Sequence, residues 1–279
     1  MGCSGGRSGE RACCSDFCRA ILGALFAAAA VLLSPAAAVS SDIRPAPFQP
    51  GERLTFALRW AFIRVGEATL EVLPDKTLDG RRVRHFALTA RSNPFMDRFY
   101  KVRDRIDAYA DPGLSRSVLY RKKQQEGRHE RDIVVRFDWK RQTVQYSNFG
   151  RPREPVALLP GALDPLSAFY FVRAAGLAPG KVIERAVTDG KKCRIGRVAV
   201  LGRETILVNG TAYDTYRIEP DLRHVGGVFE KSRDASIEVW VTADDRHIPV
   251  RVRSRVAVGS FVGEIISHAG SAGADPRPE

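Results

Sequence analysis

The chain contains an internal repeat with a period of 130 residues, seen in the step from Phe99 to Phe229. A motif of one aromatic, one lysine, one arginine and one aspartate occurs twice at this spacing: Phe99, Lys101, Arg103 and Asp104, then Phe229, Lys231, Arg233 and Asp234. Glycines recur at the same spacing: Gly66 and Gly80, then Gly196 and Gly210. Solenoid repeats have shorter periods of about 20–50 residues. The sequence therefore predicts two copies of one supersecondary unit packed together.

Apolar and polar residues alternate in both copies, as in residues 52–60, which is typical of half-buried β-strands. The pairs Asp79-Gly80 and Asn209-Gly210 are hairpin signals at equivalent positions of the repeat. About twelve strands cannot form one flat sheet, because twist makes large sheets curl or divide. We therefore expect an all-β, mainly antiparallel fold of two similar curved β-sheet halves in a barrel-like or sandwich architecture.

One segment departs from this alternation. Asp164 as N-cap, Pro165 in the first turn and Gly176 at the end predict a helix between the halves, and a second short helix is predicted at 94–99. The predicted organisation is a signal peptide over 1–38, an extended segment over 39–50, a first β half over 51–150, a linker with the short helix over 151–180, a second β half over 181–268 and a disordered tail over 269–279.

The N-terminal segment has the pattern of an export signal. Basic residues precede an apolar run over 20–34, and Ala36 and Ala38 form a small-residue cleavage site. The apolar run is shorter than the roughly 20 residues that span a bilayer, although an uncleaved anchor stays an alternative. We expect a periplasmic protein with no transmembrane segment after cleavage.

Four of the five cysteines lie in the predicted signal, so only Cys193 would stay in the mature chain. No internal disulfide is then expected. Cys193 lies in an alternating stretch, which favours a buried strand thiol over a nucleophile.

The charge balance is strongly basic, with 44 Lys and Arg against 32 Asp and Glu and a net charge of +12. Residues 249–256 place the guanidinium groups of Arg251, Arg253 and Arg255 on one face of a strand, about 7 Å apart. Arginine binds phosphate and carboxylate in a bidentate way. The row could bind an anionic lipid, lipopolysaccharide or a cell-wall glycan; the alternative, which we favour, is an outward face kept soluble.

Asp104 falls on the same side of its strand as Val102 and Ile106. A carboxylate on an apolar face is costly unless it is paired or hydrogen-bonded. With a β-bulge near Ala235, Asp234 would be its symmetry mate. The pair could be structural, ligand-binding or catalytic, and the structural interpretation is favoured.

Motifs for cofactors and catalysis do not occur in the sequence. It lacks a nucleophile elbow, a phosphate loop and a dinucleotide fingerprint, and the five histidines lack the short spacings of metal sites. The basic clusters also lack the interleaved aromatic residues of nucleic-acid binders. We expect no cofactor, no metal, no nucleic-acid partner and no catalytic residues.

Five segments resemble a known family: Pro50–Phe56, Val65–Leu70, Asp97–Asp104, Asp164–Tyr170 and Ile248–Arg251. Over about residues 48–268 the chain resembles the exported bacterial family catalogued as domain of unknown function 3108 (DUF3108). This resemblance implies a β-rich envelope protein with a signal sequence and no established activity, and it contributes no catalytic residues. The plan is also similar to that of periplasmic lipid and lipoprotein carriers, a likeness of fold alone.

The leading hypothesis is a non-catalytic periplasmic protein that holds a lipid or another anionic amphiphile on a curved apolar sheet. Arg251 and Arg253 would then meet the anionic head group. One alternative is a structural or protein-interaction module of the cell envelope that binds by strand addition. Another is a hydrolase or lyase acting on envelope glycans, with Asp104 or Asp234 as an acid.

Overall fold

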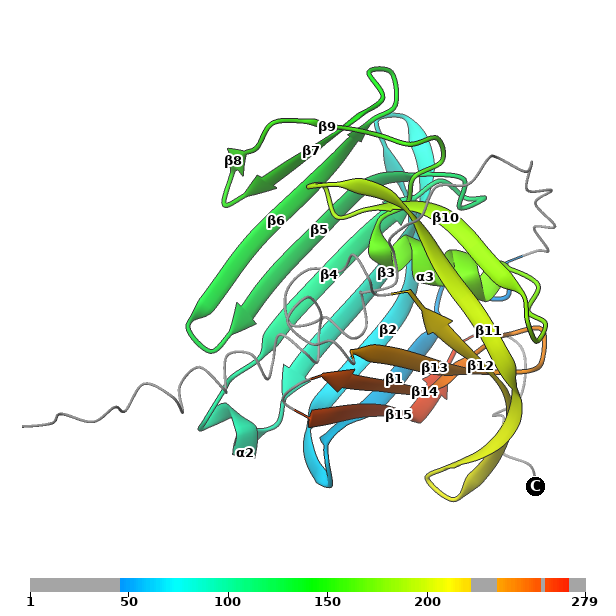
Figure 1. Ribbon diagram of the computed structural model, residues 1–279. Coiled ribbons are helices and arrows are strands. Elements are labelled where there is room, and N and C mark those ends of the chain that lie inside the picture. The colour runs from blue at the N-terminus through cyan, green and yellow to red at the C-terminus, as the bar shows by residue number, and fades with distance from the viewer. Residues whose placement is uncertain (1–45, 222–234, 257–258, 271–279) are drawn as a thin grey trace, which may run out of the picture.

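The computed structural model describes residues 46–221, 235–256 and 259–270, which form a strongly curved antiparallel sheet with one helix inside the curve (Figure 1). The fold class expected from the sequence is confirmed. The predicted signal peptide over 1–38, most of the predicted tail and the second motif, with Phe229, Lys231, Arg233 and Asp234, lie outside the described residues.

The described residues contain two helices among their strands. The strands are β1 (Arg53–Trp60), β2 (Ile63–Leu78), β3 (Arg81–Ser92), β4 (Arg103–Ala110), β5 (Ser117–Glu126), β6 (His129–Asp138), β7 (Thr143–Asn148), β8 (Arg151–Pro152), β9 (Val156–Ala157), β10 (Val182–Thr188), β11 (Cys193–Val208), β12 (Thr211–Pro220), β13 (Ser236–Thr242), β14 (Pro249–Val256) and β15 (Gly259–Ala269). The helices are α2 (Pro94–Asp97) and α3 (Pro165–Ala174), and both lie where the sequence predicts a helix. The strand β7 was not predicted from the sequence.

All of the described strands belong to a single sheet. Its order runs from β10 through β15, then from β1 through β8, with β9 paired to β7. The first half (β1–β7) and the second half (β10–β15) are joined where β15 pairs with β1 along Arg53–Trp60. The expected curved halves are therefore hydrogen-bonded edge to edge, instead of forming two separate sheets.

Strand pairing repeats with the spacing of the sequence repeat. Leu70 pairs with Leu88 in the first half, and Val200 pairs with Ile218 in the second. Further along, Lys122 pairs with Ile133, and Val252 pairs with Gly263. Each partner in the second half is the first-half residue plus 130. The two halves therefore share strand order and, in these hairpins, register.

The register identifies the position that corresponds to Asp104. Asp104 pairs with Ala90 of β3. In the second half, Ile218 pairs with Val239. Continuing this register by two residues places Ile237 opposite Pro220, the counterpart of Ala90. The predicted symmetry of Asp104 with Asp234 therefore does not follow from the pairing, because Ile237 takes the equivalent place.

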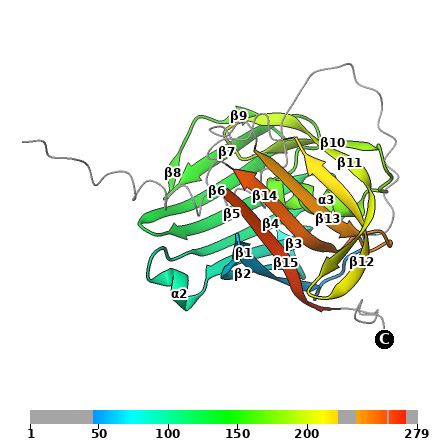
Figure 2. The same ribbon diagram turned by 60° about the horizontal axis from the view of Figure 1, so that its bottom comes forward.

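The helix α3 fills the centre of the concave side (Figures 1 and 2). Asp164 caps it, accepting hydrogen bonds from the backbone amides of Leu166 and Ser167 at 3.0 and 2.9 Å. The Tyr170 ring stacks on Phe86 of β3 with centroids 4.0 Å apart. An open apolar concave surface, as expected from the sequence, is therefore reduced by the helix that lies on it.

The rolled sheet overlaps itself instead of closing. Among the described strands, no pairing joins β10 to β7 or β8. The turn between β10 and β11 lies on the inner face of the first half, where Gly190 has φ +87° and a side chain there would meet Val135 and Tyr146. This contact explains why glycine stands at the turn.

Candidate functional site

A groove lies between α3 and the inner face of the second half. The part of it that a water-sized sphere can occupy has a volume of about 40 Å³, room for about three such spheres. The lining residues are Ala168, Phe169, Val172, Ile183, Arg185, Val187, Gly196, Val198, Ile218, Pro220 and Val239. The register explains the lining, because Ile218 and Val239 are cross-strand partners that face α3 together.

Arg185 of β10 is the one charged residue among these described lining residues. Its guanidinium lies 4.6 Å from the centroid of the Phe171 ring and donates to the carbonyl oxygens of Leu114, at 3.2 Å, and Ser115. Its Nε is buried and makes no hydrogen bond within the described part of the chain. Burial lowers the pKa of Arg185. The groove therefore combines apolar walls with one guanidinium that forms no salt bridge with a described carboxylate, while the charge of Asp111 partly offsets the effect of burial on its pKa.

A polar cluster occupies the inner face of the first half. It consists of Asp104 on β4 and Lys122, Gln124 and Glu126 on β5. Asp104 is 3% exposed, and its Oδ1 accepts a hydrogen bond from the Gln125 backbone amide at 2.9 Å. Burial, and then the nearby charge of Glu126, raise the pKa of Asp104 to about 7. Burial lowers the pKa of Lys122. The cluster thus holds an acid poised to exchange a proton near neutral pH.

The arginine row, Arg251, Arg253 and Arg255, lies on the opposite face of β14 from the groove. Val252, between them, pairs with groove-lining Val239. Arg251 binds Glu264 at 2.7 Å, and Arg255 and Arg253 lie 3.3 and 3.8 Å from Glu238. The expectation that Arg251 and Arg253 meet the head group of a ligand on the apolar face is corrected by this placement. Anion binding by the outer row stays a prediction.

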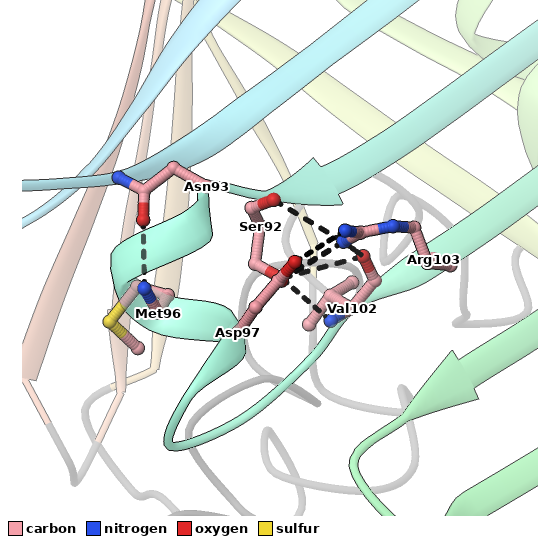
Figure 3. A network of polar contacts seen from close by, with 6 residues as sticks. All are labelled: Ser92, Asn93, Met96, Asp97, Val102 and Arg103. Atoms are coloured by element: carbon pink, nitrogen blue, oxygen red, sulfur yellow. Dashed lines mark hydrogen bonds and ion pairs between the residues drawn. The ribbon is translucent and has the colours of Figure 1, made fainter.

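The first copy of the repeated motif fixes α2 to the sheet (Figure 3). Arg103 bonds the Asp97 carboxylate at 2.5 Å, and this bond contributes most to lowering the pKa of Asp97. Ser92 accepts from the Val102 backbone amide at 2.7 Å and donates to Asp97. Lys101 and Phe99 are exposed. Of the four motif residues, Arg103 therefore holds α2, and Asp104 points into the interior.

Lys122 and Glu126 were not predicted as neighbours of Asp104. Residues 121–126 are polar at every position, so alternation could not assign a face to them. The groove was also missed, because it depends on where α3 docks. Within the described ranges, no three His, Cys, Asp or Glu side chains gather to hold a metal ion. None of the described helices is long and apolar enough to cross a membrane.

Comparisons with known proteins give a family and distant structural similarity. The sequence model of a family described as "Protein of unknown function (DUF3108)" matches residues 55–266. No curated protein matches. The chain is similar to a β-barrel-like protein of domain of unknown function DUF1849 from Brucella abortus, with 11% identity, coverage of 79% of this chain and 97% of that chain, and a TM-score of 0.49.

Two further solved structures are similar at lower scores. A protein with a YmcC-like fold from Bacteroides fragilis NCTC 9343 has 9% identity, covers 79% of this chain and 96% of that chain, and has a TM-score of 0.33. The hypothetical protein CT021 from Chlamydia trachomatis has 7% identity, covers 83% and 92%, and has a TM-score of 0.36.

Proposed function

Since this chain belongs to the DUF3108 family, whose description gives no activity, we propose its function from the site: it is a non-catalytic binding protein of the cell envelope that holds the apolar chain of an anionic amphiphile in the groove. The observation that carries the proposal is the groove between α3 and the second half. Ten of its eleven lining residues carry no charge, and the remaining one is Arg185.

The chemistry of the groove supports an amphiphile. Each methylene group that leaves water for an apolar wall contributes about 0.8 kcal/mol to binding. A guanidinium without a salt-bridge partner among the described residues supports an anionic head group, because the buried Nε of Arg185 would gain an acceptor. The predicted export signal over 1–38 and the net charge of +12 support an address among anionic envelope components.

Native mass spectrometry of the protein purified from the periplasm tests this proposal. We expect a bound amphiphile on the wild-type protein and its loss in Ala168→Phe, which fills the groove from α3. Ala212→Phe is the matched control, because Ala212 is exposed on β12, and this variant should keep the ligand. Arg185→Gln should keep binding of an uncharged alkyl probe but weaken that of dansylaminoundecanoic acid.

Two results would contradict the proposal. The first is wild-type protein that carries no extractable amphiphile and does not bind the dansyl fatty acid. The second is Ala168→Phe that binds this probe as tightly as Ala212→Phe does.

Strand addition at a sheet edge is less well supported, because both edges are partly occupied. At one edge, Leu163 accepts from the Thr188 backbone amide at 2.9 Å and donates to the Ala186 carbonyl oxygen at 2.9 Å. At the other, the short strands β8 and β9 pair with β7. Short, covered edges disfavour pairing with another chain.

The raised pKa of Asp104 favours a second candidate, acid–base chemistry at the polar cluster. Asp104→Asn separates the two. Intact folding with an unchanged ligand in the groove and a lost cellular phenotype would support chemistry at Asp104. Intact folding with a normal phenotype would leave the carboxylate without a chemical role.

A further inference from the structure

One end of the molecule exposes four large apolar side chains. Phe62 is 97% exposed and Ile63 49%, in the connection between β1 and β2, while Phe95 and Phe99, in and after α2, are 56% and 68% exposed. Single exposed apolar residues are ordinary, but a group of this size at one end indicates an interaction surface. We call these four residues the aromatic end.

Hydrogen bonds bring the two segments of the aromatic end together. The Asn93 backbone amide donates to the Val65 carbonyl oxygen at 2.9 Å, and its side-chain amide donates to the Arg64 carbonyl oxygen at 2.6 Å. Asn93 also caps α2, accepting from Met96 N at 2.9 Å (Figure 3). The Phe95 and Phe99 rings are 5.4 Å apart. The aromatic end is therefore a positioned feature of the fold.

Basic side chains surround the aromatic end. Arg91, Arg98 and Lys101 are exposed, and none of them forms an ion pair with a described residue. Of the residues that the structure describes, two nearby carboxylates are already paired, since Glu67 binds Arg64 and Asp97 binds Arg103. The end therefore carries a net positive charge next to protruding aromatic rings.

Protruding aromatic rings flanked by lysine and arginine match the chemistry of an anionic bilayer surface, where apolar groups enter the headgroup region and cations contact the lipid charges. We propose that the aromatic end docks the protein on an anionic lipid bilayer, with Phe62, Phe95 and Phe99 inserted. Anionic phospholipid is the committed partner because the surface is cationic as well as apolar.

This inference extends the proposed function, because one end of the groove, at Pro220, lies at the same end of the strands. Strands β1, β3 and β12 run in the same direction, because an even number of places separates them in the antiparallel sheet. Their last residues, Trp60, Ser92 and groove-lining Pro220, therefore lie at the same end of the strands. A protein docked through the aromatic end would present the Pro220 end of the groove toward the membrane. An amphiphile could then pass between them without crossing bulk water.

Vesicle flotation with the full mature protein tests the docking. We expect binding to vesicles of phosphatidylglycerol and phosphatidylcholine, and a loss of about tenfold or more in the triple variant Phe62→Ser/Phe95→Ser/Phe99→Ser. Leu207→Ser is the matched control, since Leu207 is 65% exposed on β11 and lies outside the aromatic end. Circular dichroism checks that these exposed substitutions leave the fold intact.

Charge gives a second arm to the same experiment. Arg98→Ala and Lys101→Ala should each weaken binding by about fivefold, and Arg141→Ala, on an exposed turn elsewhere, should weaken it less. High salt should reduce the difference. The proposal would be overturned if the triple variant floated like the wild type, or if the wild type bound equally well to vesicles of pure phosphatidylcholine. A cross-linked protein adduct at Phe62 without flotation would assign the surface to a protein partner.

The docking and the groove can fail separately. Native mass spectrometry of the triple variant should still show the bound amphiphile, because none of the three phenylalanines lines the groove. If flotation fails while the wild-type protein carries its ligand, the docking is wrong and the binding function stands.

Discussion

The two halves of the sheet pair their strands alike but present different chemistry to the interior. The position of Asp104 in the first half corresponds to Ile237 in the second, and that of Lys122 corresponds to Val252. One inner face therefore carries ionisable side chains, and the other carries the apolar wall of the groove. Register is determined by turns and by the alternation of side chains, which leaves individual inner positions free to diverge.

The helix α3 belongs to both halves, which is why the two faces share one interior. Arg173 of α3 binds Glu52, next to β1, through two bonds of 2.7 and 3.1 Å. Its Nε donates to the His247 carbonyl oxygen at 3.1 Å, between β13 and β14, and the His247 Nδ1 donates to the Arg173 carbonyl oxygen at 2.7 Å. Arg173 is 1% exposed, so these contacts are shielded from water.

The largest expected effect comes from separating the halves at this helix. Arg173→Met should lower the free energy of unfolding by about 3–5 kcal/mol, because it leaves the Glu52 carboxylate buried without its partner. Urea unfolding measures the loss. Removing both charges in Arg173→Met/Glu52→Met should recover part of it. Equal stability of the wild type and Arg173→Met would show that α3 does not join the halves.

The second effect distinguishes the two inner faces by their response to pH. The folded-state pKa of Asp104 is about 7, above the value of 3.8 that is usual for an aspartate in water. Between about pH 4 and pH 7 the folded protein therefore keeps a proton that the unfolded chain has released. The contribution of Asp104 to the free energy of unfolding falls as the pH rises through this interval, by about 4 kcal/mol at most, and is level above it.

Asp104→Asn should remove this fall, so that the variant gains stability relative to the wild type between pH 5 and pH 8. Unfolding curves at these two pH values measure the difference. The matched control is Ile237→Asn at the equivalent position, which should lose stability at both pH values and keep the wild-type slope. Parallel pH profiles for the wild type and Asp104→Asn would contradict the assigned pKa.

Whether a feature of this comparison can be predicted from the sequence depends on how far apart in the chain the interacting residues lie. Local signals were sufficient for the hairpins, where Asp79-Gly80 and Asn209-Gly210 lie between alternating segments, and for α3, where Asp164 and Pro165 mark the start. The joining of β15 to β1 has no local signal, because the partners are about two hundred residues apart.

The candidate site was less predictable than the fold. The inward face of Asp104 followed from its alternation with Val102 and Ile106, but its partner in the repeat did not, because extra residues before β13 shift the register. The bond between Glu52 and Arg173 links positions 121 apart and depends on how α3 docks. Packing of this kind is a tertiary property that neither spacing nor composition encodes.

The outer faces offer a smaller test of divergence. Arg251 and its counterpart Arg121 both point outward, but Arg251 binds Glu264, lies 5.9 Å from the Trp240 ring and donates to the Leu207 carbonyl oxygen at 2.5 Å. Arg251→Ala should lower the free energy of unfolding by about 1–3 kcal/mol. Arg121 is exposed on β5, so Arg121→Ala should change this free energy by no more than about 0.5 kcal/mol. Thermal unfolding of both variants measures the contrast, and equal effects would show that the pairing of Arg251 adds no stability.

The smallest effect should be the same in both halves, because the hairpin turns did not diverge. Gly80 and Gly210 have φ of +73° and +84°, and a methyl group at either would meet no atom within 4 Å. Gly80→Ala and Gly210→Ala should therefore each cost only the strain of a left-handed residue, about 1 kcal/mol. Gly113→Ala, equally open but outside the left-handed region, should cost nothing or stabilise slightly. Chemical denaturation of the three variants compares them. A difference of more than a few tenths of a kcal/mol between the two turns would mean that the β11–β12 hairpin tip, where Asn209 donates to the Ile265 carbonyl oxygen at 2.8 Å, has acquired a packing role that its counterpart lacks.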